Sequence, residues 1–586
     1  MKLYKICNKI SLLLHVLASA AGYFVMEAIC RHSFIEAWNY MTQRPLVFAY
    51  NAAFIFTSSL IVYLFHRRVF WRVLVTLFWL ILAIINGVLL LNRVTPFTGP
   101  DLHLITDAMK IANKYLPVAG VVAVCILFGI LVILLLMLLI KGPKYQKKIK
   151  YRYNIPLILL AVALFAGSTQ LALEKRVLSN YFGNIAFAYE DYGYPYCLTT
   201  TIFNTGISCP RDYSEKEIKR IEKTEKNLPE TQEEKRPNIL FLQLESFFDP
   251  TLVNYLNISE DPIPTFRKLM EEYSSGYYKV PSVGAGTANT EFEFLTGNTM
   301  AFLPQGSVAY QQYVKSNDYS IATYLKSKGY DTIAMHPYNA SGWDRDKVYP
   351  LFGFDTFYSL KDWVNPVKIR KYVSDQSCYD KIIELYEQKD ANTPFFLFNV
   401  TMQNHSSYSE EYDNFHPDIT VEGTSSKILP NYLSLIKLSD QALCNLIEYF
   451  SKADEDTVIV FFGDHQPSNS VAAPVWKLNG RSGDSLTEEE EARRYKVPFI
   501  IWANYDIEAA SNVETSANYL GGHVLRAAGL PLYDYRNYLS QLEEQYPVLT
   551  AIRAENAQGI STPVKDVKNT LQDYMTLQYY NIFSQK

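Results

Sequence analysis

An apolar run that leads directly into an acidic residue and a histidine is the first sign of chemistry in this sequence. Residues 458–462 read VIVFF, and Gly463, Asp464 and His465 follow before Pro467. Such a run predicts a buried strand, and open α/β sheets build their sites at the carboxyl ends of strands. Asp and His side chains are both suitable metal ligands. The pair therefore predicts part of a site whose remaining ligands, nucleophile and substrate come from other segments.

A second apolar strand, NILFLQLES at 238–246, ends at Glu245. Because the carboxyl ends of parallel strands share one edge of a sheet, we expect Glu245, Asp464 and His465 to meet there. A different role for Glu245 is that of a carboxylate beside a helix N-terminus near Ser246.

The segment VGAGTANTEFEFLTG at 283–297 supplies a candidate nucleophile, Thr287. Gly284 and Gly286 allow tight turns just before a helix that we expect to begin near Asn289. A hydroxyl at such a start is well placed to attack a phosphorus whose oxygens face backbone N–H groups. The structural alternative is that Thr287 caps the helix, and the hydroxyls of Thr290 and Ser282 remain rival nucleophiles.

Glu245, Thr287 and Asp464 would offer three oxygen ligands and His465 one nitrogen. This fairly hard donor set favours Mn²⁺ or Mg²⁺, with zinc left open, whereas the absence of any CxxC pair argues against a thiolate zinc centre. A bound cation would lower the pKa of the Thr287 hydroxyl and neutralise charge on the attacked phosphate.

The elements that must position these residues follow a strongly apolar first third of the chain. The 586 residues are 49% hydrophobic and only 19% charged. We predict five membrane spans, at about 8–30, 45–65, 69–91, 116–140 and 153–173. The first has Lys2, Lys5 and Lys9 ahead of it but no small-residue cleavage site followed by a soluble domain, so we interpret it as a helix and not a signal peptide.

Basic residues predict the orientation of these spans. They gather between the second and third spans at 66–72 and between the fourth and fifth spans at 141–152. By the positive-inside rule both loops and the N-terminus are cytoplasmic, and five spans put everything after Leu173 outside the cell. These clusters follow membrane ends and the net charge is −4, so we expect no nucleic-acid partner.

The outer part divides in two. We predict a linker at 174–237, whose charged segment 211–237 is expected to be a solvated helix and tether, and a catalytic domain at 238–586. Cys197 and Cys209 either pair or remain free thiols. Beyond 238, strands alternate with helices such as those expected at 320–329 and 428–450, which indicates a mostly parallel sheet between helical layers. The five strands that we expect are NILFLQLES at 238–246, YDTIAMHP at 330–337, PFFLFNVTMQNH at 394–405, TVIVFFGDH at 457–465 and VPFIIWAN at 497–504.

Several motifs together resemble the lipoteichoic acid synthase family of the alkaline phosphatase and sulfatase superfamily. They are GTANTEFEFLTG at 286–297, LPQGS at 303–307, HPYNASGWDRD at 336–346, NHSSY at 404–408 and FFGDHQP at 461–467, with RVTPFTGPDL at 93–102 similar to the family's outer loop. The resemblance implies five spans and an external sulfatase-like domain. It also implies that Thr287 is the nucleophile, that Glu245, Thr287, Asp464 and His465 bind one Mn²⁺, and that His336, Trp343, Arg345 and His405 bind phosphoglycerol.

Elementary chemistry agrees with these assignments. Arg345 offers a planar fork of donors to a phosphate, and Trp343 an apolar wall to glycerol. His336 and His405 each follow a predicted strand, and His405 is the preferred proton shuttle, although either could be a satisfied structural imidazole. We expect His416 and His523 to be structural.

The sequence departs from the family at Tyr338, where the family has an acidic residue, and at Gly342, where it has an aromatic one. Both changes concern the substrate pocket and leave acceptor and head group open. The C/S-x-P-x-R context of sulfatase nucleophiles is absent around Thr287, which disfavours sulfate ester hydrolysis.

The location then favours one reaction. Outside the membrane there is no ATP, so the transferred group must come from an envelope lipid. We predict transfer of glycerol phosphate from phosphatidylglycerol, through a glycerophospho-threonine, to a glycolipid, a lipoteichoic acid chain or another envelope glycan. Two alternatives stay open: a phosphoethanolamine transferase of the same superfamily, and a non-catalytic envelope protein on an inactive enzyme fold.

Overall fold

The chain forms two compact units, residues 1–206 with 304–306 and residues 207–303 with 307–586. The structure is a computed structural model. It describes residues 10–90, 96–99, 101, 118–175, 177–178, 185–203, 209–210, 213–224, 236–304, 307–315 and 319–583, and leaves the side chains of 118–128, 185–187, 222–224, 484 and 565 undescribed.

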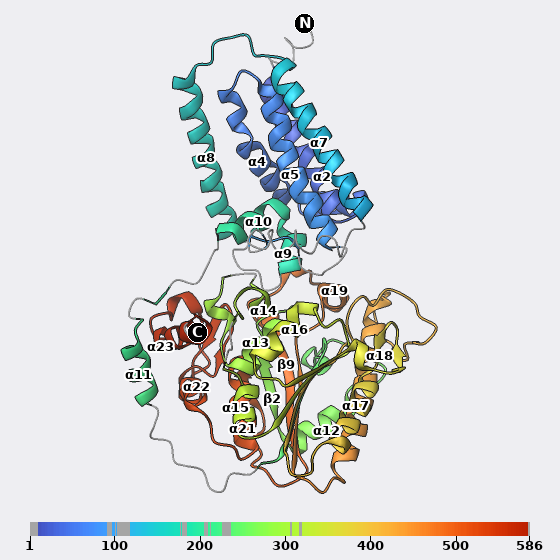
Figure 1. The fold of residues 1–586 in the computed structure, drawn as a ribbon. Helices are drawn as coiled ribbons and strands as arrows, with labels where there is room; N and C mark the ends of the chain where they lie inside the picture. Colours follow the sequence, from blue (N-terminus) through green and yellow to red (C-terminus); the bar gives the residue numbers. More distant parts are fainter. Residues whose placement is uncertain are drawn as a thin grey trace. The chain divides into compact units, whose positions relative to one another are not determined.

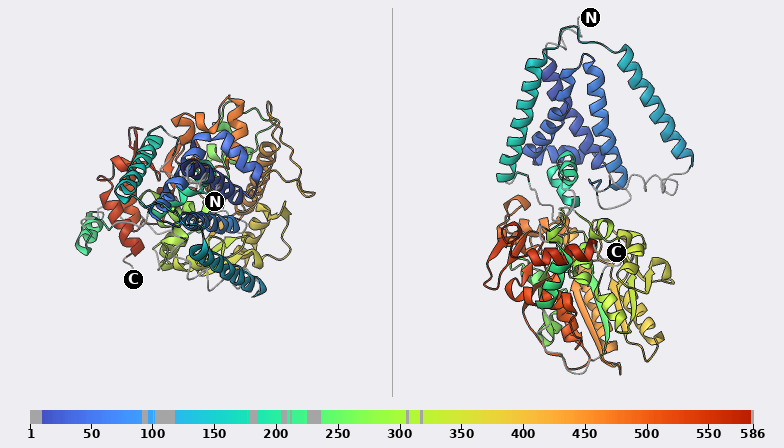
Figure 2. Two further views of the ribbon diagram at one scale, coloured as in Figure 1. Left: turned by 90° about the horizontal axis from the view of Figure 1, so that it is seen from above. Right: turned by 60° about the vertical axis from the view of Figure 1, so that its left-hand side comes forward.

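The first unit is helical. Its long helices are α2 (Ser11–Cys30), α4 (Pro45–Ser58) continued by η1 (Leu60–Leu64), α5 (Arg68–Leu90), α7 (Val118–Lys141) and α8 (Tyr151–Glu174). Shorter helices are α3 (Phe34–Gln43), α9 (Ile185–Tyr192) and α10 (Tyr194–Phe203). Helices α2, α4 and α5 pack together, whereas α7 and α8 flank them (Figures 1 and 2). Helix α8 buries none of its residues within the unit, as expected for an apolar helix whose partner is lipid.

Four helices among the described residues are long and apolar enough to cross a membrane: Ser11–Cys30, Pro45–Leu64, Arg68–Leu90 and Tyr151–Glu174. They agree with the predicted first, second, third and fifth spans. The predicted fourth span coincides with α7, but residues 116–117 and the side chains of 118–128 lie outside the description. The count of five spans therefore stays a prediction.

The second unit is built on an eight-stranded sheet in the order β10-β2-β9-β8-β1-β7-β3-β4. Only β9 runs antiparallel to its neighbours in this sheet. The strands are β1 (Asn238–Leu244), β2 (Ser274–Lys279), β3 (Asp331–His336), β4 (Thr356–Ser359), β7 (Phe395–Val400), β8 (Thr457–Gly463), β9 (Lys496–Ala503) and β10 (Val513–Ser516). This is the mostly parallel sheet that the sequence predicts, with β9, expected from VPFIIWAN, reversed.

Helices cover both faces of the sheet because the central strands are apolar on both sides. Along β1, Ile239 and Phe241 enter one core, and Leu240 and Leu242 enter the other. The first core includes residues of α13 (Thr287–Thr296), α14 (Ala309–Gln312), α15 (Ile321–Ser327), α16 (Arg345–Leu351) and α21 (Ala517–Ala527). The second includes residues of α12 (Pro264–Glu272), α17 (Asp375–Gln388), α18 (Ile428–Phe450) and α19 (Asn469–Leu478). Figure 1 shows α13, α15 and α21 on the side of the sheet opposite to α12, α17 and α18.

Smaller elements complete the unit. They are the hairpin β5 (Lys368–Ile369) and β6 (Tyr372–Val373), the sheet β11 (Val548–Leu549), β12 (Arg553–Glu555) and β13 (Ser561–Pro563), and helices α20 (Glu488–Arg493), α22 (Asp534–Gln545) and α23 (Gln572–Phe583). Short 3₁₀ turns, among them η5 (Gly342–Asp344) and η6 (Leu360–Asp362), lie in the loops.

The charged segment predicted as a solvated tether does form a helix, α11 (Glu215–Thr224), but this helix is docked. Its Ile218 and Ile221 pack with Leu577 of α23, and Arg220 pairs with Asp573 at 2.9 Å. The two isoleucines lie three residues apart, so they share one face and bury it together. Residues 225–235 lie outside the described residues.

Candidate active site

The ends of β1 and β8 bring the first three predicted ligands together. The two strands are parallel neighbours with Leu244 opposite Gly463, so the next residues, Glu245 and Asp464, emerge side by side. Asp464 N donates to Leu244 O at 3.0 Å and prolongs the ladder by one step. Candidate ligand atoms of Glu245, Asp464 and His465 all lie within 4.8 Å of one another, and the three residues are buried.

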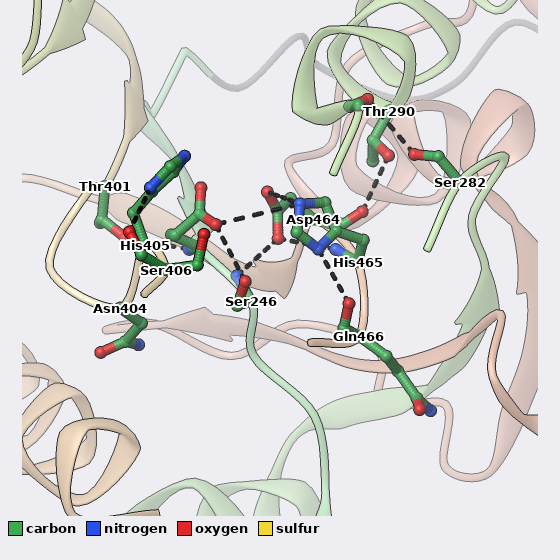
Figure 3. A network of polar contacts seen from close by, with 12 residues as sticks. Ser246, Ser282, Thr290, Thr401, Asn404, His405, Ser406, Asp464, His465 and Gln466 are labelled. Atoms are coloured by element: carbon green, nitrogen blue, oxygen red, sulfur yellow. Dashed lines mark hydrogen bonds and ion pairs between the residues drawn. The ribbon is translucent and has the colours of Figure 1, made fainter. Parts of the chain in front are cut away.

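The Asp464 carboxylate is bonded on one side only. Oδ1 accepts from the amides of Ser246 and His465, both at 2.7 Å. Oδ2 is buried without a hydrogen bond from the described residues and lies 3.2 Å from His465 Nε2 (Figure 3). Glu245 Oε1 accepts from Ser246 Oγ at 2.9 Å and lies 3.9 Å from the same His465 nitrogen. Ser246 reaches both carboxylates from a left-handed conformation, φ 50°.

The histidine turns a lone pair toward the carboxylates. His465 Nδ1 lies 3.0 Å from Gln466 O, and a carbonyl only accepts, so Nδ1 carries the hydrogen and Nε2 is left with its lone pair. Burial lowers the pKa of His465, which keeps the ring neutral. An acceptor nitrogen and a carboxylate oxygen 3.2 Å apart are two ligands that a shared cation would satisfy.

The pKa values of the two carboxylates also favour a bound cation. Burial raises the pKa of Asp464 to about 7, although the amides of Ser246 and His465 and the nearby Thr287 hydroxyl stabilise its ionised form. Burial and the adjacent Asp464 charge raise the pKa of Glu245. Two carboxylates and a neutral imidazole of this kind fit a divalent cation, because its charge reverses both shifts.

Thr287 is the first residue of α13, and its hydroxyl is the candidate nucleophile beside this cluster. The N-cap is Gly286 at φ 93°, so Thr287 is the first helical residue and not the cap, and the helix starts two residues before the predicted Asn289. A Cβ at position 286 would lie 2.9 Å from Ser282 Oγ, so the turn needs glycine.

The rival hydroxyls are engaged elsewhere. Thr290 Oγ1 donates to Asp464 O at 2.8 Å, and Ser282 Oγ donates to Gly286 O at 3.3 Å (Figure 3). Thr287 is thus the hydroxyl of the three that lies at the helix start and electrostatically favours ionised Asp464.

The two remaining site histidines share the orientation of His465. His336, the last residue of β3, has Nδ1 2.9 Å from Val400 O, and burial with the Arg345 charge lowers its pKa well below the usual value. His405 lies five residues beyond β7, with Nδ1 3.0 Å from Ser406 O and 3.2 Å from Tyr372 Oη. In each ring, therefore, a carbonyl holds Nδ1–H and Nε2 keeps its lone pair.

Arg345 lies in this region but is held by the protein. Its Nη2 donates to Glu291 Oε1 and its Nε to Glu291 Oε2 at 3.2 Å, while Nη1 lies 3.4 Å from Gly342 O. Both side chains are buried. Arg345 thus presents at most Nη1 to a ligand, not the two-pronged fork that the sequence suggested. Trp343 precedes it in a left-handed conformation, φ 59°.

Sequence reasoning missed Glu291, Ser246 and Tyr372. Glu291 follows Thr287 by one helical turn, and this i, i+4 spacing was a usable signal. Ser246 is placed by a left-handed backbone turn and Tyr372 by a short hairpin, and no sequence pattern predicts either feature. Cys197 and Cys209, left open above, are both free thiols, and His523 pairs with Glu543 at 2.7 Å, as expected of a structural histidine.

The comparisons with known proteins agree with this architecture. A family model described as "Sulfatase" matches residues 237–530. A Rhizobium meliloti (strain 1021) protein named for cyclic beta-1,2-glucan modification is 30% identical over 410 residues, covering 68% of this chain and 63% of that protein. Lipoteichoic acid synthase of Staphylococcus aureus (strain USA300) is 28% identical over 247 residues, covering 39% of this chain and 36% of the synthase.

Among solved structures, the phosphoglycerol transferase GacH of Streptococcus pyogenes, in complex with sn-glycerol-1-phosphate, has the same fold. The TM-score is 0.53 at 22% identity, covering 64% of this chain and 95% of that one. The chain matches less than two thirds of the length of the two curated relatives above. These similarities confirm the predicted resemblance and fold class, and with the apolar helices they identify a multi-pass membrane protein whose sulfatase-like domain lies outside the cell.

Proposed function

This chain belongs to the sulfatase family, and we propose from that premise that it is a membrane-anchored phosphoglycerol transferase. It moves glycerol phosphate from phosphatidylglycerol, through a covalent bond to Thr287, to a hydroxyl of an envelope glycolipid or glycan. The observation that carries the proposal is the position of Thr287. Its hydroxyl is the first of α13, beside a buried cluster of two carboxylates and an imidazole that could hold a metal ion.

The residues that would hold a metal are Glu245, Asp464, His465 and Thr287, and Mn²⁺ fits their mainly oxygen donors. When bound, such an ion supplies positive charge that lowers the pKa of the Thr287 hydroxyl and neutralises the attacked phosphate.

In the first half-reaction Thr287 Oγ1 attacks the phosphorus of phosphatidylglycerol, and its proton passes to His405 Nε2. The first N–H groups of α13 face the phosphate oxygens, because helix N-termini stabilise anions. As the P–O bond to diacylglycerol breaks, His405 Nε2 donates that same proton to the leaving oxygen. The neutral His336 orients the substrate from the end of β3, and Trp343 offers an apolar contact to glycerol.

In the second half-reaction an acceptor hydroxyl attacks the same phosphorus. Its proton passes to His405 Nε2, and as the bond from phosphorus to Thr287 breaks, His405 returns that proton to Thr287 Oγ1. His405 is suited to both proton transfers because the Ser406 carbonyl keeps its ring oriented with Nε2 available.

The test uses the full-length protein in detergent with Mn²⁺ and phosphatidylglycerol labelled in its head group. We expect diacylglycerol release and a labelled protein adduct, and Thr287→Ala should abolish both. Thr290→Ala is the matched control, because Thr290 bonds the Asp464 carbonyl and should affect the rate far less. Diacylglycerol release that persists in Thr287→Ala would refute the assignment.

The same assay separates the other functions. Release from phosphatidylethanolamine, and not from phosphatidylglycerol, would identify a phosphoethanolamine transferase. A wild-type protein that binds no Mn²⁺ and forms no adduct would indicate a non-catalytic envelope protein.

A further inference from the structure

Two tyrosine rings stand beside the histidines of the site and have no part in the chemistry described so far. Tyr338 follows His336 by two residues, and its ring centroid lies 6.2 Å from that of His336. Tyr372, on the β5–β6 hairpin, lies 5.5 Å from His405 and 6.5 Å from Tyr338. The four rings therefore form a continuous row, with a tyrosine pair between the two histidines.

Tyr338 is unusually exposed for an aromatic side chain of this unit. Its exposed fraction is 38%, and among the described residues of the unit only Phe583, at 39%, is also a large exposed aromatic side chain. The Tyr338 hydroxyl makes no hydrogen bond within the part of the chain that the structure describes. A ring that is open to solvent at the edge of a catalytic site, with a free hydroxyl, is a binding surface that the fold itself does not require.

Gly342 keeps this surface open. A Cβ built at position 342 would lie 3.8 Å from Tyr338 Cδ1 and 3.8 Å from Arg345 Nη1, so a longer side chain would occupy the space next to both. Gly342 does not have a positive φ, so its backbone does not demand glycine. The small residue thus preserves room beside the Tyr338 ring.

The nearby cations are already engaged, which argues against a polyanionic ligand at this place. Arg370 donates to the carbonyls of Gln403, His405 and Ser407, at 2.6 to 2.7 Å. Arg345 is held by Glu291, and Lys371 lies 3.9 Å from Glu410. The row offers aromatic faces and neutral hydroxyls instead of free positive charge.

We propose that Tyr338 and Tyr372, with the space left by Gly342, form the acceptor subsite of this enzyme and bind a neutral sugar ring. Sugars present a face of C–H groups that packs on aromatic rings and a rim of hydroxyls that bonds polar groups such as Tyr338 Oη. A sugar on this surface lies beside His405, which takes the proton of the attacking hydroxyl. The phosphorus–oxygen bond to that sugar forms as the bond to Thr287 breaks.

The inference rests on the proposed function, and its test separates the two. Full-length protein with Mn²⁺ and head-group-labelled phosphatidylglycerol is supplied with either a neutral β-glucan oligosaccharide or a glycerol phosphate oligomer. Diacylglycerol release measures the first half-reaction and labelled oligosaccharide the second. A wild-type protein that releases no diacylglycerol contradicts the proposed function, whereas release without transfer to the glucan overturns the acceptor subsite alone.

Variants then test the residues. We expect Tyr338→Ala to lower kcat/KM for the glucan about tenfold more than it lowers donor cleavage, mainly through KM. Tyr338→Phe, which keeps the ring, should recover most of this loss, and Gly342→Phe should reproduce it by filling the space. Tyr449→Ala, on α18 and bonded to Glu387, is the matched control. Equal glucan kinetics in Tyr338→Ala and wild type, or preferential use of the glycerol phosphate oligomer, would overturn the proposal.

Discussion

Helix α13 connects two buried carboxylate clusters that neutralise their charge in opposite ways. Near its first residue, Glu245 and Asp464 lie beside a neutral histidine, and burial raises the pKa of both carboxyls. One turn later, Glu291 accepts hydrogen bonds from Arg345 and from Tyr310 and Tyr349, at 3.1 and 2.8 Å. The residues of both clusters are buried, so burial alone does not distinguish them.

The difference lies in where the counter-charge comes from. The Glu291 cluster carries its own cation, so it is complete as folded and holds α13 to α16. In the Asp464 cluster a carboxylate oxygen and an imidazole nitrogen face each other, and no cationic side chain among the described residues pairs with either, so a bound metal ion would supply the counter-charge. A buried carboxylate without a cationic side chain beside it is thus a candidate metal ligand. A buried carboxylate that is paired with an arginine has a structural role.

The largest effect should come from removing a ligand of the Asp464 cluster. Asp464→Asn keeps the shape of the side chain but removes its negative charge and one of its two ligand oxygens, so we expect diacylglycerol release to fall at least about a thousandfold. Asp440→Asn is the matched control, since Asp440 is a buried aspartate whose carboxylate accepts from the amides of Thr265 and Phe266, away from the candidate metal ligands. Activity within about tenfold of wild type in Asp464→Asn would contradict the metal assignment.

A substitution in the Glu291 cluster should lower the stability of the protein. Glu291→Gln leaves the Arg345 charge buried without its partner, and we expect a loss of about 3–5 kcal/mol in the free energy of unfolding. Guanidinium unfolding of the full-length protein, followed by tryptophan fluorescence, measures it. The double variant Glu291→Gln/Arg345→Met should recover much of the loss. A single variant as stable as wild type would show that Arg345 is free to serve a substrate.

The other carboxylate of α13, that of Glu293, pairs with no cationic side chain among the described residues. Burial raises its pKa to about 8, Oε1 accepts from Met300 N at 2.7 Å, and Oε2 is buried without a hydrogen bond from the described residues. Because the folded state holds this proton more tightly than the unfolded state, stability is full at low pH and falls as pH rises toward 8. Between pH 5 and 7 we expect a loss of about 1.4 kcal/mol per pH unit from this group.

The measurement compares thermal unfolding of wild type and Glu293→Gln across that range, with metal removed by a chelator. The difference between the two proteins isolates Glu293 from other titrating groups. Parallel curves would mean that Glu293 has an ordinary pKa in the folded protein.

The smallest expected effect is the stabilisation by the ion itself. Mn²⁺ at one hundred times its Kd should stabilise the wild-type protein by about 2.7 kcal/mol, visible as a raised melting temperature. Asp464→Asn should lose this shift, and Glu291→Gln should keep it despite its lower starting stability. An equal shift in Asp464→Asn would place the ion elsewhere.

Much of the fold was predictable because the signals are local. The apolar runs that become β1, β3, β7, β8 and β9 were recognisable, and α18 occupies the predicted 428–450. Strands β2, β4 and β10 were not, because they are short and contain polar residues whose burial depends on neighbours. The reversal of β9 likewise depends on pairing with β2 and β8 and not on its own composition.

The sequence by itself determined which residues end apolar strands and where a hydroxyl follows glycines, since strand burial and turn formation are properties of short segments. It therefore predicted Glu245, Thr287, Asp464 and His465 as one set. Only the tertiary structure decided the partners. That Arg345 faces Glu291, and that Tyr338 and Tyr372 line up between two histidines, depends on how α13, α16 and the β5–β6 hairpin pack. Contacts between residues so distant in the chain are set by that packing.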